Sequence, residues 1–175
     1  MKLSLIALVA VVIVLIMVAA TVGAYSILSA TTGTVSIYVK DAPLDWKYVN
    51  VTFSEVRIHK ASAGNESGWQ TLSIKNGVID LTNLSDVSEL LASSNVSIGK
   101  YTQIRIVVTS ATGMMQDGTS VNLSIPSGEL KTTHPFNVTS GQKKNLTIDI
   151  DLEHSIVHNS QGWIFKPVLG AISEN

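Results

Sequence analysis

The feature that most constrains the fold is an alternation of apolar and polar residues with a period of two. In KKNLTIDIDL, residues 143–152, leucine and isoleucine alternate with asparagine, threonine and aspartate. VSIYVK at 35–40 and VNVTF at 49–53 alternate in the same way, whereas a helical period is almost absent after residue 33. Successive side chains of a strand point to opposite faces of a sheet, so this pattern predicts strands with one buried and one solvated face.

Turn signals divide the alternating sequence into short segments. The apolar phase slips by one residue near Ser54 and Glu55, which predicts a β-bulge within one strand from 49 to 58. Pro167 must lie at an edge or a bulge, because proline cannot donate to a ladder. Further strands are expected over 69–74, 77–81, 101–109, 119–125, 136–139, 145–152 and 162–171, and a short helix capped by Ser85 over 86–92. The sequence therefore predicts an all-β fold, a two-sheet antiparallel β-sandwich of about 8–9 strands with one short helix.

An uninterrupted apolar run, LIALVAVVIVLIMVAA, precedes this domain. Residues 3–24 would form a helix of roughly 33 Å, enough for a hydrocarbon core of about 30 Å. Two interpretations remain open: an uncleaved transmembrane anchor, or a secretory signal peptide cleaved after Ala24. We expect an anchor or signal at 1–24, a short tether at 25–32 and the β-sandwich at 33–172. The domain then faces the outside of the cell membrane, or is secreted if the segment is cleaved.

Composition excludes several classes of function. The formal net charge is −1 and the pI is about 6.4, so the chain has no basic field for nucleic acid. Cysteine is absent, which excludes disulfides, zinc–thiolate sites and cysteine nucleophiles. Nucleic acid is thus not an expected partner. From the apolar N-terminal segment we expect the membrane as a partner, and from the exported domain other surface proteins or identical subunits.

Glycosylation sequons are more frequent than chance allows. Seven of the ten asparagines begin Asn-X-Ser/Thr, against about two expected from the 36 serines and threonines. The seven are Asn50, Asn65, Asn83, Asn95, Asn122, Asn137 and Asn145. Alternation places four of them, at 50, 122, 137 and 145, on solvated strand faces, where a bulky glycan requires them. The sequence therefore predicts a glycoprotein of an archaeal host, the alternative being a compositional excess of polar residues on exposed faces.

Candidate metal ligands are few. Asp149 and Asp151 lie two residues apart on one face, and Asp41 follows a strand, so these carboxylates are the candidates for a hard cation such as calcium. The simpler interpretation is that they are solvated. His154 and His158 have the spacing of a helical metal pair but lack the neighbouring glutamate of zinc proteases.

No other motif calls for chemistry. There is no nucleophile elbow, phosphate loop or dinucleotide fingerprint, so we predict no catalytic residue, no cofactor and no enzyme. Trp46, Trp69 and Trp163 are candidates for a carbohydrate platform, although core and cross-strand packing is the commoner role of tryptophan in a sandwich.

Ten short strings follow one another along the chain: KDAP (40–43), VNVTF (49–53), VRIH (56–59), GW (68–69), IDL (79–81), GKYTQIR (99–105), IPSG (125–128), IDID (148–151), SIV (155–157) and FKPV (165–168). In content and order this series resembles the DUF4382 family, exported prokaryotic domains of unknown function. Lys40 and Ile150 stand where the family usually has Thr and Phe. The resemblance covers residues 33–172 and implies a β-sandwich at the cell envelope, with no catalytic residue to transfer.

These observations lead to one main hypothesis and two alternatives. The main hypothesis is an envelope-anchored, glycosylated cell-surface β-sandwich with a structural or adhesive role. The first alternative is a surface or secreted module that binds carbohydrate or calcium. The second is a filament subunit, in which residues 25–33, freed by cleavage, add as a strand to a neighbouring subunit.

Overall fold

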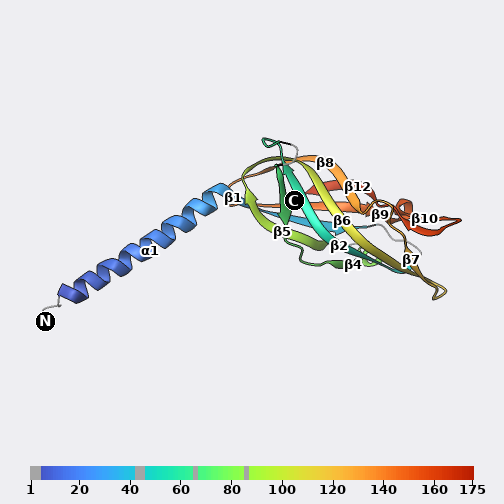
Figure 1. Cartoon of the computed structure of the whole chain (residues 1–175), viewed down its shortest axis with the longest axis horizontal. Coiled ribbons are helices and arrows are strands. Elements are labelled where there is room, and N and C mark those ends of the chain that lie inside the picture. Colours follow the sequence, from blue (N-terminus) through green and yellow to red (C-terminus); the bar gives the residue numbers. More distant parts are fainter. Residues whose placement is uncertain (1–4, 42–45, 65–66, 85–86) are drawn as a thin grey trace.

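A computed structural model describes residues 5–41, 46–64, 67–84 and 87–175, and within the N-terminal helix the side chains of residues 10–24 and 31 (Figure 1). Helix α1 (Leu5–Thr31) leads directly into the first strand. The segment expected to be a tether, 25–32, is therefore helical through Thr31. In the uncleaved chain, residues 25–31, which the filament alternative would use as a strand after cleavage, belong to this helix.

Two larger sheets contain most of the strands. The four-stranded sheet has the order β12-β9-β1-β5 and consists of β1 (Thr32–Lys40), β5 (Glu89–Ser97), β9 (Lys143–Asp151) and β12 (Val168–Glu174). The six-stranded sheet consists of β2 (Trp46–Lys60), β3 (Trp69–Leu72), β4 (Val78–Asp80), β6 (Gly99–Met115), β7 (Ser120–Leu123) and β8 (Glu129–Val138). A hairpin of β10 (Ile156–Asn159) and β11 (Gly162–Phe165), a 3-10 turn at Leu81–Asn83 and helix α2 (Leu152–Ser155) complete the described elements. The prediction of a mostly β fold is confirmed.

The four-stranded sheet is mixed, so the expectation of purely antiparallel pairing was wrong. β1 pairs with β9 in parallel, with Thr34 opposite Lys143 and Lys40 opposite Asp149. β5 and β12 pair antiparallel to β1 and β9 respectively. More than one hundred residues separate β1 from β9, and a connection of that length permits parallel pairing, which a short hairpin does not.

The β-bulge in β2 is confirmed. The register with β6 shifts on both sides of Phe53, between Thr52 and Phe53 and again between Phe53 and Glu55. Because of the extra residue, Val51 and Phe53 before the bulge and Val56 and Ile58 after it all face the core. The bulge thus lets one long strand keep a single buried face through a change of phase.

Pro167 divides the predicted last strand into two. β11 ends at Phe165, and β12 begins at Val168 in a different sheet. The prediction of a continuous strand over 162–171 was therefore wrong, although the constraint behind it held: proline has no N–H for a ladder, and the chain leaves one sheet for another at that residue.

The helix expected over 86–92 is a strand instead. Residues 85–86 lie outside the described residues, and β5 begins at Glu89 and pairs with β1 over its whole length. Leu91 and Ala92 are both fully buried, although they are adjacent, because the register with β1 shifts between Ile37 and Tyr38. Sequence alternation could not show this, since the irregularity is a property of the pair of strands.

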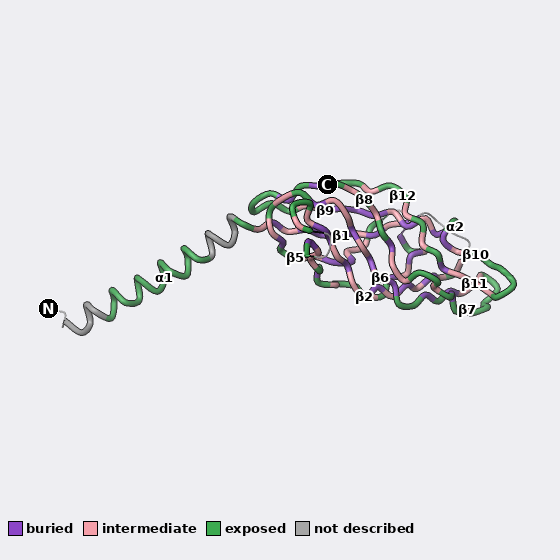
Figure 2. The backbone as a smooth tube through the Cα atoms, turned by 45° about the horizontal axis from the view of Figure 1, so that its top comes forward, coloured by how far each residue is buried: buried purple, intermediate pink, exposed green. Residues whose placement is uncertain are grey.

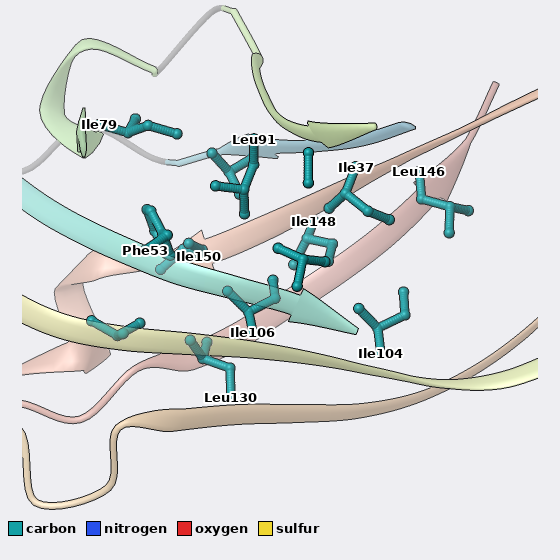
Figure 3. Packing of buried hydrophobic residues seen from close by; sticks show 14 of the residues in the cluster. Ile37, Phe53, Ile79, Leu91, Ile104, Ile106, Leu130, Leu146, Ile148 and Ile150 are labelled. Carbon is teal, nitrogen blue, oxygen red and sulfur yellow. The ribbon is translucent and has the colours of Figure 1, made fainter. Parts of the chain in front are cut away.

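Both larger sheets contribute to one hydrophobic cluster. Ile37 and Ile148 reach it from the four-stranded sheet, and Ile104 and Ile106 reach it from the six-stranded sheet (Figure 3). All four side chains are at most 1% exposed. At about 25 cal/mol per Å² of apolar surface removed from water, this burial is the main driving force for folding the domain.

Helix α1 extends away from the β-rich part of the chain (Figure 1), and its described residues are exposed along the whole length drawn in Figure 2. Valine, leucine, isoleucine and methionine side chains from Val11 to Val18 are about half exposed or more. Judged on its described residues, the chain contains no helix of the length and hydropathy that a membrane crossing needs.

The strand assignment of β5 gives the first prediction. Leu91 is fully buried and Leu90 only half-buried. Leu91→Ala should therefore reduce the free energy of unfolding by about 2–5 kcal/mol, whereas Leu90→Ala, the same truncation one residue earlier, should cost clearly less. Urea unfolding of the two variants checks this. Equal losses would contradict the strand and favour a helix that turns both leucines inward.

Candidate functional site

The predicted metal ligand Asp41 acts as a buried hydrogen-bond acceptor. Its side chain is 4% exposed, and its Oδ1 accepts the Leu152 backbone N–H at 3.1 Å. Its own N–H lies 3.4 Å from the Leu84 carbonyl oxygen. The Asp41 carboxylate therefore links the end of β1 to the start of α2. This hydrogen bond stabilises the contact between two segments that are 111 residues apart in the sequence.

The two carboxylates of β9 have separate partners. Asp149 forms an ion pair with Lys40 of the adjacent strand at 3.1 Å. Asp151 caps α2, because its Oδ1 accepts the His154 backbone N–H at 3.1 Å and its Oδ2 lies 2.8 Å from His154 Nδ1. The backbone hydrogen bond from His154 is the main cause that lowers the pKa of Asp151.

The structure thus brings Asp41 and Asp151 to the ends of neighbouring strands, where each carboxylate accepts a backbone N–H of α2. Among the described residues, no three His, Cys, Asp or Glu side chains are placed to hold a metal ion together. His154 and His158, the other candidate pair, also diverge: His154 contacts Asp151, and the His158 ring lies 4.6 Å from the Trp163 ring.

Ser155 is a residue whose role sequence analysis missed. It is fully buried, and its hydroxyl donates to the Asp151 carbonyl oxygen. The Ser155 Oγ in turn accepts the Val168 N–H at 2.8 Å. The Lys166 N–H donates to its carbonyl oxygen at 2.8 Å. Ser155 therefore ties α2 to the segment on either side of Pro167. A serine within a short apolar string carries no signal of such a role.

Two sequons present free asparagine side chains on outer strands. Asn122 lies on β7 and Asn137 on β8, and both strands pair with β6 at their inner edge. Both asparagines are exposed, and neither makes a side-chain hydrogen bond within the part of the chain that the structure describes. A glycan on either amide would extend into solvent.

The remaining described sequons are more constrained. Asn83 donates to Asp80 Oδ2 at 2.9 Å, and the Oδ1 of Asn95 accepts the Thr34 hydroxyl at 2.9 Å. Asn50 is half-buried between Asp80 of β4 and Thr112 of β6.

Asn145 lies beside a buried residue of its own sequon. It is half-buried in an inner strand, and Thr147, the hydroxyl residue of its sequon, is 8% exposed. Asn65 lies outside the described residues. Of the four asparagines expected on solvated strand faces, Asn122 and Asn137 are exposed, whereas Asn50 and Asn145 are half-buried in strands that have a neighbour on each side.

The tryptophans do not form a flat platform for sugar. Trp46 and Trp163 meet edge to face, with ring centroids 5.1 Å apart at 87°. Trp69 is distant from that pair along β2, and the Arg105 guanidinium lies 4.1 Å from its ring centroid. Stacking on a sugar needs an open ring face, and these rings are used in packing and in a cation–π contact instead.

An ion-pair network surrounds Trp69 on the six-stranded sheet. Glu129 lies 3.4–3.5 Å from Arg57 and Arg105 and 2.9 Å from Lys131. The hydrogen bond from Lys131, with the nearby cations, lowers the pKa of Glu129 below 4.5. The stabilisation from this network is therefore present above pH 4.5 and is lost as the pH falls through the lowered pKa of Glu129. The ion-paired residues come from three strands, β2, β6 and β8, and Trp69 from a fourth, β3, so no local motif could reveal the network.

The position of Asp41 gives the second prediction. Asp41→Ala leaves the buried Leu152 N–H without this acceptor, and the free energy of unfolding should fall by about 1–3 kcal/mol. Asp149→Ala removes an ion pair whose Lys40 is 43% exposed and should cost at most about 1 kcal/mol. Chemical unfolding at pH 7 compares the two. Equal costs would contradict the structural role of Asp41.

Comparison with known proteins gives the family and nothing finer. No curated protein and no solved structure matches the chain significantly. The family model described as a domain of unknown function, DUF4382, matches residues 32–167. That range runs from the start of β1 to Pro167 and includes Asp41, Asp151, Ser155 and every described sequon asparagine. The resemblance seen in the sequence is confirmed, and the chain belongs to the DUF4382 family.

Proposed function

We propose that this protein is a membrane-tethered, glycosylated β-sandwich on the outer surface of the cell, with a structural or adhesive role and no catalytic activity. The single observation that carries the proposal is the pair of free, exposed sequon asparagines, Asn122 and Asn137, on the outer strands of a domain that follows an apolar helix. The host must have N-glycosylation machinery for these sites to be used.

The sandwich is supported by contacts that join the two larger sheets at both edges. At one edge, Ser93 of β5 donates its N–H to the Ser73 carbonyl oxygen at 2.9 Å, and Lys75 donates to the Leu91 carbonyl oxygen at 2.8 Å. At the other edge, Glu174 of β12 contacts His134 of β8. These contacts, together with the shared core, favour two layers facing each other with their outer faces in solvent.

The tether is supported by the composition and exposure of α1. A helix that is apolar on all sides is stable in water only if it is covered, and the usual cover is a membrane or a protein core. Thr21 is the only polar residue from Leu5 to Ala24, and its hydroxyl is satisfied within the helix by the Val18 carbonyl oxygen at 2.9 Å. We therefore infer that the membrane surrounds α1 and that the β domain lies outside the cell.

Intact-mass analysis and N-terminal sequencing of the protein from its own membranes test the proposal. A start at Met1 or Lys2 with added hexose-containing masses is the expected result. A start at Tyr25 without added mass would contradict both the tether and the glycan.

The geometry of the sequons gives a site-resolved prediction. Glycopeptide mapping should find Asn122 and Asn137 occupied, and Asn145, half-buried beside the buried Thr147, unoccupied. Asn122→Gln and Asn137→Gln should each remove one glycan and change stability by no more than about 0.5 kcal/mol, because both side chains are exposed. Occupancy of Asn145 with both outer sites empty would contradict the assignment.

A further inference from the structure

Two turns of the β domain lie directly beside the end of α1. The Ile98 N–H, in the β5–β6 turn, donates to the Thr31 carbonyl oxygen at 3.0 Å. The Gly141 N–H, in the β8–β9 turn, donates to the Thr32 carbonyl oxygen at 2.9 Å. Helix and domain are thus joined without an intervening linker, so that the position of α1 fixes which end of the domain is nearest to it.

Lysines gather at this end of the domain. The Ala61 N–H donates to the Lys100 carbonyl oxygen at 2.8 Å, which places Lys60 beside the β5–β6 turn. Lys143 begins β9, opposite Thr34 in the parallel ladder. We call the side chains Lys60, Ile98, Lys100 and Lys143 the base face.

The base face combines positive charge with an exposed apolar residue. Ile98 is 40% exposed, and Lys100 and Lys143 are exposed. The Nζ of Lys60 donates to the Ser97 hydroxyl at 3.2 Å, which holds this charge beside the β5–β6 turn.

The lysines of the base face take no part in the ion pairs found among the described residues. The carboxylate of Glu174, on β12, is engaged by Lys144 and His134 instead.

The length of α1 sets how far the base face would lie from a bilayer. If the apolar run at 3–24 crosses the hydrocarbon core, residues 25–31 add about 10 Å of helix. The headgroup layer on one side is about 5–8 Å thick. The base face would then lie at the outer boundary of the headgroups, within the Debye length of about 8 Å at physiological salt.

We propose that the base face rests on an anionic lipid surface, with its lysines against the headgroups and Ile98 in the interfacial layer. This inference rests on the membrane tether of the proposed function and adds a second contact, made by the β domain itself. Lysines beside a membrane are attracted to anionic headgroups, and an exposed aliphatic residue among them is removed from water by the same contact. The contact would hold the domain in one orientation, with β10 and β11 directed away from the membrane.

The absence of cysteine allows a direct test with the full chain. Ile98→Cys carries a polarity-sensitive fluorophore at the base face, and Val157→Cys, on β10 at the opposite end and 48% exposed, is the matched control. Each labelled protein is reconstituted into phosphatidylcholine vesicles with or without phosphatidylglycerol. The label at 98 should show blue-shifted emission and quenching by nitroxide lipids in the anionic vesicles, and the label at 157 should show neither.

Removing the positive charge of the base face tests whether the contact with lipid is electrostatic. Lys100→Gln with Lys143→Gln, in the Ile98→Cys protein, should reduce the blue shift in anionic vesicles. Salt at 1 M, which shortens the Debye length to about 3 Å, should do the same. A blue shift that is equal in neutral and anionic vesicles, or unchanged by the two substitutions, would overturn the recognition of anionic lipid.

The outcomes separate the two proposals. If the protein floats with vesicles but the label at 98 behaves like the label at 157, the base-face contact is overturned and the tether stands. If the protein does not float with vesicles of either composition, the tether itself fails.

Discussion

The parallel pairing of β1 with β9 is the constraint on which the rest of the structure depends. It places Val35, Ile37 and Val39 beside the apolar residues of KKNLTIDIDL, and all of these side chains are fully buried. Because β1 follows α1 without a linker and β9 precedes α2, the same pairing joins the strand that follows the N-terminal helix to the strand that leads into the C-terminal third of the domain. Loss of this pairing would open the core and release both.

The pairing also gives the domain two different ends. One end, where β1 and β9 begin, carries the junction with α1 and the lysines of the base face. The other, where these strands finish, carries Asp41, Asp151 and Ser155, whose polar groups satisfy backbone N–H groups around α2 and Pro167. The first end is the one that we propose to meet a charged surface. The second end is closed by its own hydrogen bonds, and its described carboxylates act as acceptors in them.

Local pattern predicted much of the fold, because burial of one strand face imposes a period of two whatever the partner strand is. It predicted the bulge beside Phe53 and the buried face of β9 for this reason. It failed at β5, where adjacent Leu91 and Ala92 are buried by a register shift, and it could not give the parallel order of β1 and β9. The candidate site was also predictable only in part. Sequons can be recognised from three consecutive residues, but whether the Asn95 side chain is hydrogen-bonded depends on Thr34, which is distant in the sequence.

Hydrogen exchange of backbone amides, followed by mass spectrometry on the full chain, tests most directly whether β1 and β9 form one cooperative unit. The inner amides of both strands should exchange at the same slow rate and lose protection together as urea is added, because each strand is the other's partner. Protection of β9 that persists after β1 has exchanged would contradict the parallel pairing as the foundation of the fold.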